Sequence, residues 1–289
     1  MDYETGQRGT TSGWLYLVGY IIFTIDMQRL FSLFFALFFL SLSHAGGLSN
    51  DEPEEAGRYQ PRYYPFADGE RVLYQASWNG IPIAKAKIHT SLVWRGGKKF
   101  YQVKVRARTF KYLDPFWKMR DSIESIFEAD TLRPHRYTFR QRENRKRIDT
   151  TALYDHESKK WVVRRQKRHK VRQFEFMSRN TLDPISATYF VRSIDFEVGD
   201  RIQLEVFGGK SRYLVILDVV GEERIRVKAG LFNAYKIIPR VINLSRSGYA
   251  RRVRQVTVWM SADQKRRPLR IISDVFIGSV YIEMVDEMA

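Results

Sequence analysis

The stretch NTLDPISATYFVR, residues 180–192, contains the clearest helix start in the chain. Asp183 can cap a helix, Pro184 suits the first helical position because no N–H is needed there, and Arg192 falls near the end, where a cation complements the helix dipole. Runs of strand-like alternation lie on both sides. The pattern therefore predicts one short helix near residues 184–192 that divides a β-rich chain into two halves.

The flanking segments alternate apolar and polar residues at the period of two that is typical of strands. Arg71–Trp78 precedes the turn pair Asn79-Gly80, and a further turn is expected at Gly221-Glu222. Connections of about two to six residues favour antiparallel neighbours, since parallel pairs need a longer crossover. The predicted fold is all-β: an antiparallel meander curled into a barrel, half-barrel or sandwich.

The composition is basic and free of cysteine. The 289 residues include 49 Lys and Arg against 32 Asp and Glu, which gives a formal net charge of +17. Such a charge attracts anions, so nucleic acid, anionic lipid and acidic polysaccharide are candidate partners. The absence of cysteine excludes disulfides, thiolate catalysis and cysteine-bound metal.

The N-terminal region has the pattern of a targeting segment. From Met27, one positive charge at Arg29 precedes an apolar core, Leu30–Leu42, and the small-residue site Ser43-His44-Ala45, which predicts a secretory signal cleaved after Ala45. One alternative is an uncleaved membrane anchor over residues 14–42, although charged residues interrupt it. Another is translation that starts at Met27.

Three segments follow from these patterns. Residues 1–45 are predicted to be an N-terminal extension with the signal peptide or anchor, and residues 46–65, which are acidic and contain proline, a flexible linker. Residues 66–289 are predicted to form the β domain, in two halves joined by the short helix. The basic character lies in this last segment.

No motif specifies a catalytic or metal centre. The five histidines are scattered without metal-ligand spacing, so neither a metal nor another cofactor is predicted. Gly208-Gly209-Lys210-Ser211 lacks the first glycine of a phosphate-binding loop, and a hairpin turn is the better interpretation. The Gly-x-Ser-x-Gly elbow of α/β-hydrolases is also missing. We therefore expect a protein that is not an enzyme.

The basic run RRQKRHKVR, residues 164–172, is the strongest electrostatic feature. The candidate anion-binding residues are Arg164, Arg165, Lys167, Arg168 and Lys170. Strict alternation would place Arg164, Arg168 and Lys170 on one face and Arg165 and Lys167 on the other. Both faces would then be polar, so the segment is expected to project beyond the core as an extended hairpin. The alternative is a solvated edge hairpin whose charges prevent edge-to-edge pairing.

Several short motifs occur together in a specific order. They are Gly69-Glu70 with Tyr74 and Trp78, RDSIES at 120–125 with LRP at 132–134, DPISA at 183–187, AGLFNA at 229–234, and VWMSAD at 258–263 with Arg267-Pro268. In this order they resemble the bacterial family called domain of unknown function 3108, over about residues 66 to 286. The resemblance implies an exported envelope protein of Gram-negative type, located in the periplasm, with no established enzyme activity.

Three functional hypotheses remain open. The first is a periplasmic binding or assembly factor that holds an anionic phospholipid, lipopolysaccharide or other anionic envelope component, with tryptophans partly lining an apolar concavity (Trp78, Trp94, Trp117, Trp161 and Trp259). The second is a cell-wall polymer hydrolase, which would need Asp121, Glu124 and Asp263 to converge. The third is a structural module that docks on an envelope protein through strand edges. Export argues against nucleic acid as a partner.

Overall fold

The computed structural model describes residues 60–244, 256–274 and 278–288, and within these residues the chain forms antiparallel strands, one short α-helix and one 3-10 helix. The predicted signal peptide or anchor and most of the predicted linker lie outside the described residues. The elements are β1 Arg71–Trp78, β2 Ile81–Arg95, β3 Lys98–Thr109, η1 Lys111–Leu113, β4 Arg120–Glu128, β5 Pro134–Glu143, β6 Lys146–Asp155, β7 Lys160–Lys167, β8 Lys170–Met177, α3 Pro184–Arg192, β9 Arg201–Phe207, β10 Arg212–Val227, β11 Gly230–Asn243, β12 Val256–Ser261, β13 Pro268–Asp274 and β14 Ser279–Met288. The predicted all-β class, with its short helix, is confirmed.

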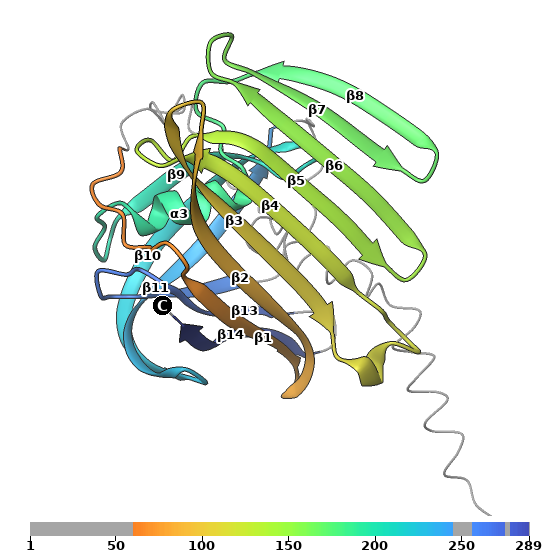
Figure 1. Ribbon diagram of the computed structural model, residues 1–289. Helices are drawn as coiled ribbons and strands as arrows, with labels where there is room; N and C mark the ends of the chain where they lie inside the picture. The colour runs from red at the N-terminus through yellow and green to blue at the C-terminus, as the bar shows by residue number, and fades with distance from the viewer. Residues whose placement is uncertain (1–59, 245–255, 275–277, 289) are drawn as a thin grey trace, which may run out of the picture.

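The strands form one sheet of 14 strands in the order β8-β7-β6-β5-β4-β3-β2-β1-β14-β13-β12-β11-β10-β9. Neighbours along the chain pair with each other, and β1 pairs with β14, so both halves of the chain belong to one continuous sheet. Figure 1 shows this sheet curling around α3. The sheet stays open, because its two edges, β8 and β9, are not paired with each other.

The turn chemistry explains the hairpins and one error of the sequence-based prediction. Asn79 and Gly80 both have positive φ, 45° and 85°, as a two-residue hairpin turn of the favoured type requires. The turn predicted at Gly221-Glu222 is wrong, since β10 continues through these residues to Val227. The register shifts between Val219 and Gly221 instead, which is a β-bulge of the kind that lets a long strand bend.

The core lies on the concave face of the sheet. Along β3, for example, Val103, Val105 and Ala107 are buried, whereas the residues between them are exposed. The helix α3 lies against this face, and every residue of it except Thr188 is buried. A helix that is buried all round belongs to the core, so α3 fills the interior of the curled sheet. Within the described residues, no helix is long and apolar enough to cross a membrane.

The N-terminus of α3 is fixed by the cap that the sequence predicts. One carboxylate oxygen of Asp183, Oδ1, accepts hydrogen bonds from the amides of Ile185 (2.9 Å) and Ser186 (3.1 Å). The other, Oδ2, accepts from the hydroxyl of Ser125 on β4 at 2.7 Å. Burial raises the pKa of Asp183, whereas these hydrogen bonds lower it by favouring the charged form. The cap thus ties the helix to the sheet as well as starting it.

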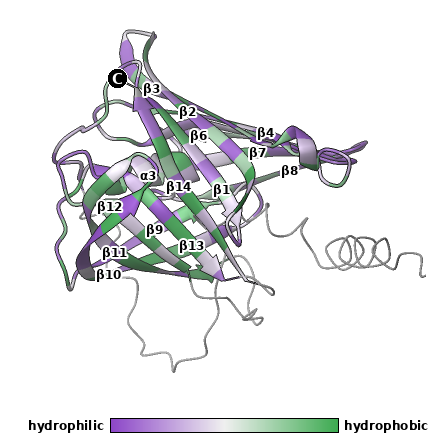
Figure 2. Cartoon of the chain, turned by 90° about the horizontal axis from the view of Figure 1, so that it is seen from below, coloured by the Kyte–Doolittle hydropathy of each residue, from purple (hydrophilic) through white to green (hydrophobic). Residues whose placement is uncertain are grey.

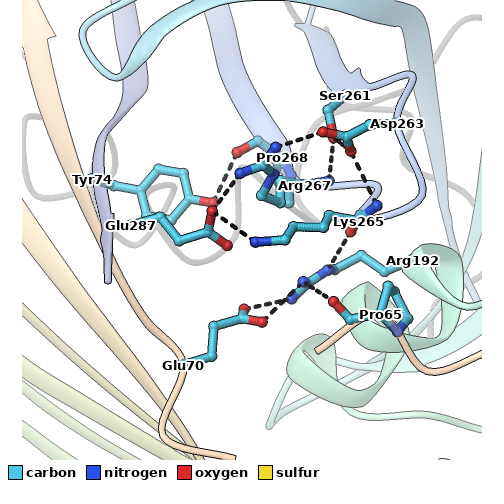
Figure 3. A network of polar contacts seen from close by, with 10 residues as sticks. All are labelled: Pro65, Glu70, Tyr74, Arg192, Ser261, Asp263, Lys265, Arg267, Pro268 and Glu287. Carbon is cyan, nitrogen blue, oxygen red and sulfur yellow. Dashed lines mark hydrogen bonds and ion pairs between the residues drawn. The ribbon is translucent and has the colours of Figure 1, made fainter. Parts of the chain in front are cut away.

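The C-terminus of α3 is fixed by a buried ion pair. Arg192 Nη1 lies 3.0 Å from Oε1 of Glu70, and Nη2 lies 3.3 Å from Oε2, so the pair is bidentate. Arg192 also donates to the carbonyl oxygen of Lys265 at 3.2 Å (Figure 3). Both charged side chains are almost inaccessible to solvent. The pair therefore joins the helix to the start of β1 and to the turn before β13.

We expect Glu70→Ala to lower the free energy of unfolding by about 3–5 kcal/mol, because it leaves the Arg192 charge buried without its counter-ion. Asp195→Ala is the matched control: it removes the partner of Arg62 from an exposed ion pair and should cost at most about 1 kcal/mol. Urea unfolding followed by circular dichroism measures both. Equal losses in the two variants would contradict the anchoring role of Glu70.

Candidate functional site

A cavity of about 400 Å³ lies between the β7–β8 hairpin and the β9–β10 hairpin. These two hairpins form the opposite edges of the sheet. The cavity therefore occupies the seam where the sheet stays open. We call this space the seam cavity.

Aromatic rings form one wall of the seam cavity. Phe174 and Phe176 come from β8 and Phe207 comes from the end of β9. The ring centroid of Phe207 lies 5.2 Å from that of Phe176 and 6.3 Å from that of Phe174. Behind them, the buried Trp161 stacks on Phe176 at 6.1 Å. Side-chain packing thus bridges the two edges, which are not joined by strand pairing.

Basic side chains form the rest of the lining. They come from β7 (Arg165, Lys167), β8 (Lys170, Arg172), the turn after β9 (Lys210) and the start of β10 (Arg212). Ser211 is the remaining lining residue. Cations beside aromatic rings give a site that can bind an anionic group and an apolar group at once.

The register of the β7–β8 hairpin explains why these cations gather. Arg165 lies directly opposite Arg172, and Lys167 directly opposite Lys170. Residues that face each other across an antiparallel pair point to the same side of the sheet. Trp161 opposite Phe176 and Val163 opposite Phe174 continue the same face. Along the hairpin, this face therefore changes from apolar at the base to cationic at the tip.

Arg165 is the most enclosed of the cations on the hairpin. Its Nη1 donates a hydrogen bond to the buried hydroxyl of Thr150 on β6 at 2.9 Å. Burial lowers the pKa of the Arg165 guanidinium, because a charge that is partly removed from water is disfavoured. Within the described residues, no carboxylate forms an ion pair with Arg165.

The two arginines at the rings are placed differently. The guanidinium of Arg212 lies 5.1 Å from the ring centroid of Phe176 and forms an ion pair with Glu205 at 3.1 Å. The guanidinium of Arg172 lies 5.6 Å from the centroid of Phe174. Cation–π contacts hold both guanidinium groups beside the aromatic wall.

The structure divides the five predicted anion-binding residues. Arg165, Lys167 and Lys170 line the seam cavity. Arg164 points to the opposite face, where its Nη2 donates to Gln166 at 3.3 Å. Arg168 lies in the turn between β7 and β8, with φ of 55°.

The predicted division of the run into two faces is wrong at the turn. Residues 168 and 169 belong to neither strand, so the alternation restarts at Lys170. Lys167 and Lys170 therefore share a face, although strict alternation separates them. The turn is the physical reason, because a two-residue hairpin loop brings its flanking residues side by side.

The prediction of a projecting hairpin fits only the tip of the segment. Lys167 and the four residues Lys170–Gln173 are exposed, whereas Trp161 and Val163 at the base are fully buried. Figure 2 shows this side of the sheet extending away from the rounded body. The base of the hairpin is thus part of the core, and its tip carries the cations.

Sequence reasoning missed the other side of the cavity. Lys210 and Ser211 line the cavity from the hairpin turn between β9 and β10. The prediction of a hairpin turn at Gly208-Gly209-Lys210-Ser211 is therefore confirmed. Phe207 and Arg212 flank the turn. Their position about 40 residues from the basic run gave no sign of proximity. The signal that could have found them is the chain order, since the strands β8 and β9 follow one another with only the short helix α3 between them.

The carboxylates of the hydrolase hypothesis do not share a site. Asp121 is buried on the concave face, and its Oδ1 accepts from the amide of Arg142 at 2.6 Å. Glu124 belongs to the opposite face of β4, where it accepts from Gln102 at 2.6 Å. Asp263 lies in the turn between β12 and β13, bonded to Ser261 at 2.6 Å. Within the described residues, no group of three or more His, Cys, Asp or Glu side chains could hold a metal ion.

The tryptophans do not gather around one concavity. Trp161 packs behind the cavity wall, whereas Trp94 is 69% exposed. Trp259 belongs to a second, smaller cluster of buried residues and donates from Nε1 to Glu223 at 2.6 Å. Only Trp161 among these three is in contact with the rings of the seam cavity.

Comparison with known proteins identifies the family. Residues 73–285 match the family described as protein of unknown function, DUF3108. The chain belongs to this family. The family resemblance inferred from the sequence is therefore confirmed. A search among curated proteins finds no significant match for this DUF3108 protein.

Solved structures share the fold of the DUF3108 protein at low sequence identity. A β-barrel-like protein of a different domain of unknown function, DUF1849, from Brucella abortus has 10% identity and a TM-score of 0.51, covering 76% of this chain and 97% of its own. A predicted exported protein with a YmcC-like fold from Bacteroides fragilis has 6% identity and a TM-score of 0.37, covering 79% and 100%. A predicted lipoprotein from Parabacteroides distasonis has 7% identity and a TM-score of 0.38, covering 80% and 98%. The first of these supports the curled-sheet fold of the DUF3108 protein.

The buried Asp121 should make stability depend on pH. Burial, followed by the nearby Glu143 carboxylate, raises its pKa to about 7. The folded chain thus binds this proton more tightly than the unfolded chain does. The free energy of unfolding is therefore highest at low pH and falls as the pH rises towards 7. Asp121→Asn should remove this loss, so the variant gains at least about 1 kcal/mol relative to the parent between pH 5 and pH 8. Urea unfolding at the two pH values tests this. The same change in the free energy of unfolding between pH 5 and pH 8 in the variant and the parent would contradict it.

The opposed lysines at the hairpin tip should cost stability. Lys170→Gln removes the repulsion with Lys167 and should raise the free energy of unfolding by about 0.2–1 kcal/mol at low salt. The gain should shrink in high salt, because exposed charges are screened. Arg164→Gln is the control, since Arg164 lies opposite the neutral Gln173. Thermal unfolding at two salt concentrations compares the two, and no difference between them would argue against the repulsion.

Proposed function

We propose that this DUF3108 protein is a non-enzymatic binding or assembly factor of the periplasm that holds an anionic amphiphile, a lipid with a negatively charged head group, in its seam cavity. The observation that carries the proposal is the composition of the lining. Six cations and three phenylalanines surround one space, so the anionic head and the start of an acyl chain each find a matching wall.

The size of the cavity supports a partly enclosed ligand. Its volume of about 400 Å³ lies at the lower end of the range of about 300–1,000 Å³ that is usual for small-molecule sites. Complete acyl chains would need more room. The head group and the first part of one chain would therefore be held, and the remainder would stay in a membrane or in another apolar surface.

The chemistry of the lining supports binding rather than catalysis. Ser211 provides the only nucleophilic oxygen among the side chains that line the cavity, and no histidine or carboxylate accompanies it there. Histidine and carboxylate are the usual partners that activate a serine as a nucleophile. The aromatic and cationic lining instead supplies affinity and orientation.

The predicted signal over residues 27–45 and the expectation for the family support a location in the periplasm. An exported protein meets anionic phospholipid and lipopolysaccharide, both of which combine phosphate groups with acyl chains. Nucleic acid is not expected in that compartment. The same lining in a cytosolic protein would support a wider choice of anions.

Vesicle co-sedimentation of protein purified from the envelope of its expressing cell tests the proposal. Vesicles of zwitterionic lipid are compared with vesicles that contain an added anionic phospholipid, at low and at physiological salt. We expect Lys167→Gln/Lys170→Gln to reduce binding to the anionic vesicles about tenfold, since two charge-assisted contacts are lost.

The control is Arg164→Gln/Arg168→Gln, which removes the same charge from the opposite face and the turn of the same hairpin. It should retain most of the binding. Equal losses in both variants would reduce the effect to net charge and contradict a specific site. Binding to zwitterionic and anionic vesicles alike would also contradict it. A single envelope protein crosslinked to β8, with no lipid enriched in the purified protein, would instead favour docking through the free edge of that strand.

A further inference from the structure

We propose, resting on the function proposed above, that the head group held in the seam cavity carries two or more phosphate groups and is bound from both edges of the sheet at once. Binding of an anionic amphiphile in general does not specify how many charges the head group carries.

The cations of the cavity come from two sources. Arg165, Lys167, Lys170 and Arg172 belong to the β7–β8 hairpin, at one edge of the sheet. Lys210 and Arg212 belong to the β9–β10 hairpin, at the other. A single phosphate would neutralise a small part of this charge. Two phosphates on one head group can contact both sets together.

The cations that the β7–β8 hairpin contributes to the lining differ from Arg212 in their ion pairing. Arg212 forms an ion pair with Glu205 at 3.1 Å. On the β7–β8 hairpin, Lys160 forms an ion pair with Glu175 at 3.2 Å, but neither residue lines the cavity. None of the four cations that the hairpin contributes to the cavity has a carboxylate partner within the described part of the chain. Several positive charges are thus left for a ligand to compensate.

The register adds a second, independent observation. Arg165 opposite Arg172 and Lys167 opposite Lys170 are like-charge pairs, which destabilise an antiparallel pair of strands. The opposite face of the same hairpin places Gln173 across from Arg164 and Val171 across from Gln166, with no such conflict. Local conflicts of this kind concentrate at functional sites. Both conflicts lie on the face that lines the cavity.

The types of cation favour phosphate. Three of the six are arginines, whose planar guanidinium can donate two parallel hydrogen bonds to phosphate oxygens. Arg165 and Arg172 face each other on the hairpin, and Arg212 lies on the other edge beside Phe176. Lysines complete the site as point charges. The arrangement fits a polyphosphorylated head better than a single carboxylate.

A lipid series with constant acyl chains tests the number of phosphates. Phosphatidylinositol, its monophosphate and its bisphosphate, all with the same two short chains, are titrated against detergent-solubilised protein by isothermal calorimetry. Each added phosphate should raise the affinity about tenfold at low salt, because it makes at least one new charge-assisted contact. Inositol trisphosphate, which has no acyl chain, separates binding of the head group from binding of the whole lipid.

Variants on each edge test the bridging. Arg165→Gln on β7 and Lys210→Gln on the β9–β10 turn should each reduce the preference for the bisphosphate over the unphosphorylated inositol lipid by about tenfold. Arg164→Gln, on the outer face of the hairpin, should leave the preference unchanged. Unchanged thermal midpoints confirm that the variants are folded.

Failure of this inference is distinguishable from failure of the proposed function. Equal affinity for all three lipids overturns the requirement for several phosphates and leaves anionic amphiphile binding in place. A preference that Arg165→Gln removes and Lys210→Gln does not would overturn the bridging of the two edges. No binding of any lipid in the series, together with no enriched lipid in protein purified from the envelope, overturns both.

Discussion

The buried ion pair between Arg192 and Glu70 is the constraint on which the rest of the structure depends. It holds the C-terminus of α3 against the start of β1, while the capping residue Asp183 holds the N-terminus against Ser125 on β4. With both ends fixed, the helix stays inside the curled sheet. The charges are tolerated in the core because each has its partners, and the loss of either one would leave the other buried and uncompensated.

The trapped helix explains why the sheet has a seam. The chain runs from β8 through α3 to β9, so the two strands that would have to pair to close the sheet are separated by a helix that is folded inwards. Part of the free edge of β9 is satisfied by Leu182, whose amide donates to Glu205 and whose carbonyl accepts from Phe207. Phenylalanine rings from both edges pack against each other at one wall of the remaining gap. The opening is therefore a consequence of the fold, and its lining is what the sequence can vary.

Local signals in the sequence predicted the elements well and the site only in part. The helix from Pro184 to Arg192 agrees with the predicted bounds because capping chemistry is local. The burial of Arg192 could not be predicted, since its partner Glu70 lies 122 residues away. The turn at Gly221 failed because glycine signals a bulge as well as a turn. Likewise, the basic run indicated one wall of the cavity, whereas the opposite wall depends on how far the sheet curls.

The basic hairpin reconciles two interpretations that the sequence set against each other. Charged residues on an edge strand discourage pairing with another chain, and the edge strand β8 carries Lys170 and Arg172. The same two side chains line the cavity, together with Arg165 and Lys167 of β7. Because successive residues of a strand point to opposite sides, Arg164 lies on the other face of β7, away from the cavity. Replacing the cations that line the cavity while keeping Arg164 therefore separates binding in the cavity from the effect of net charge.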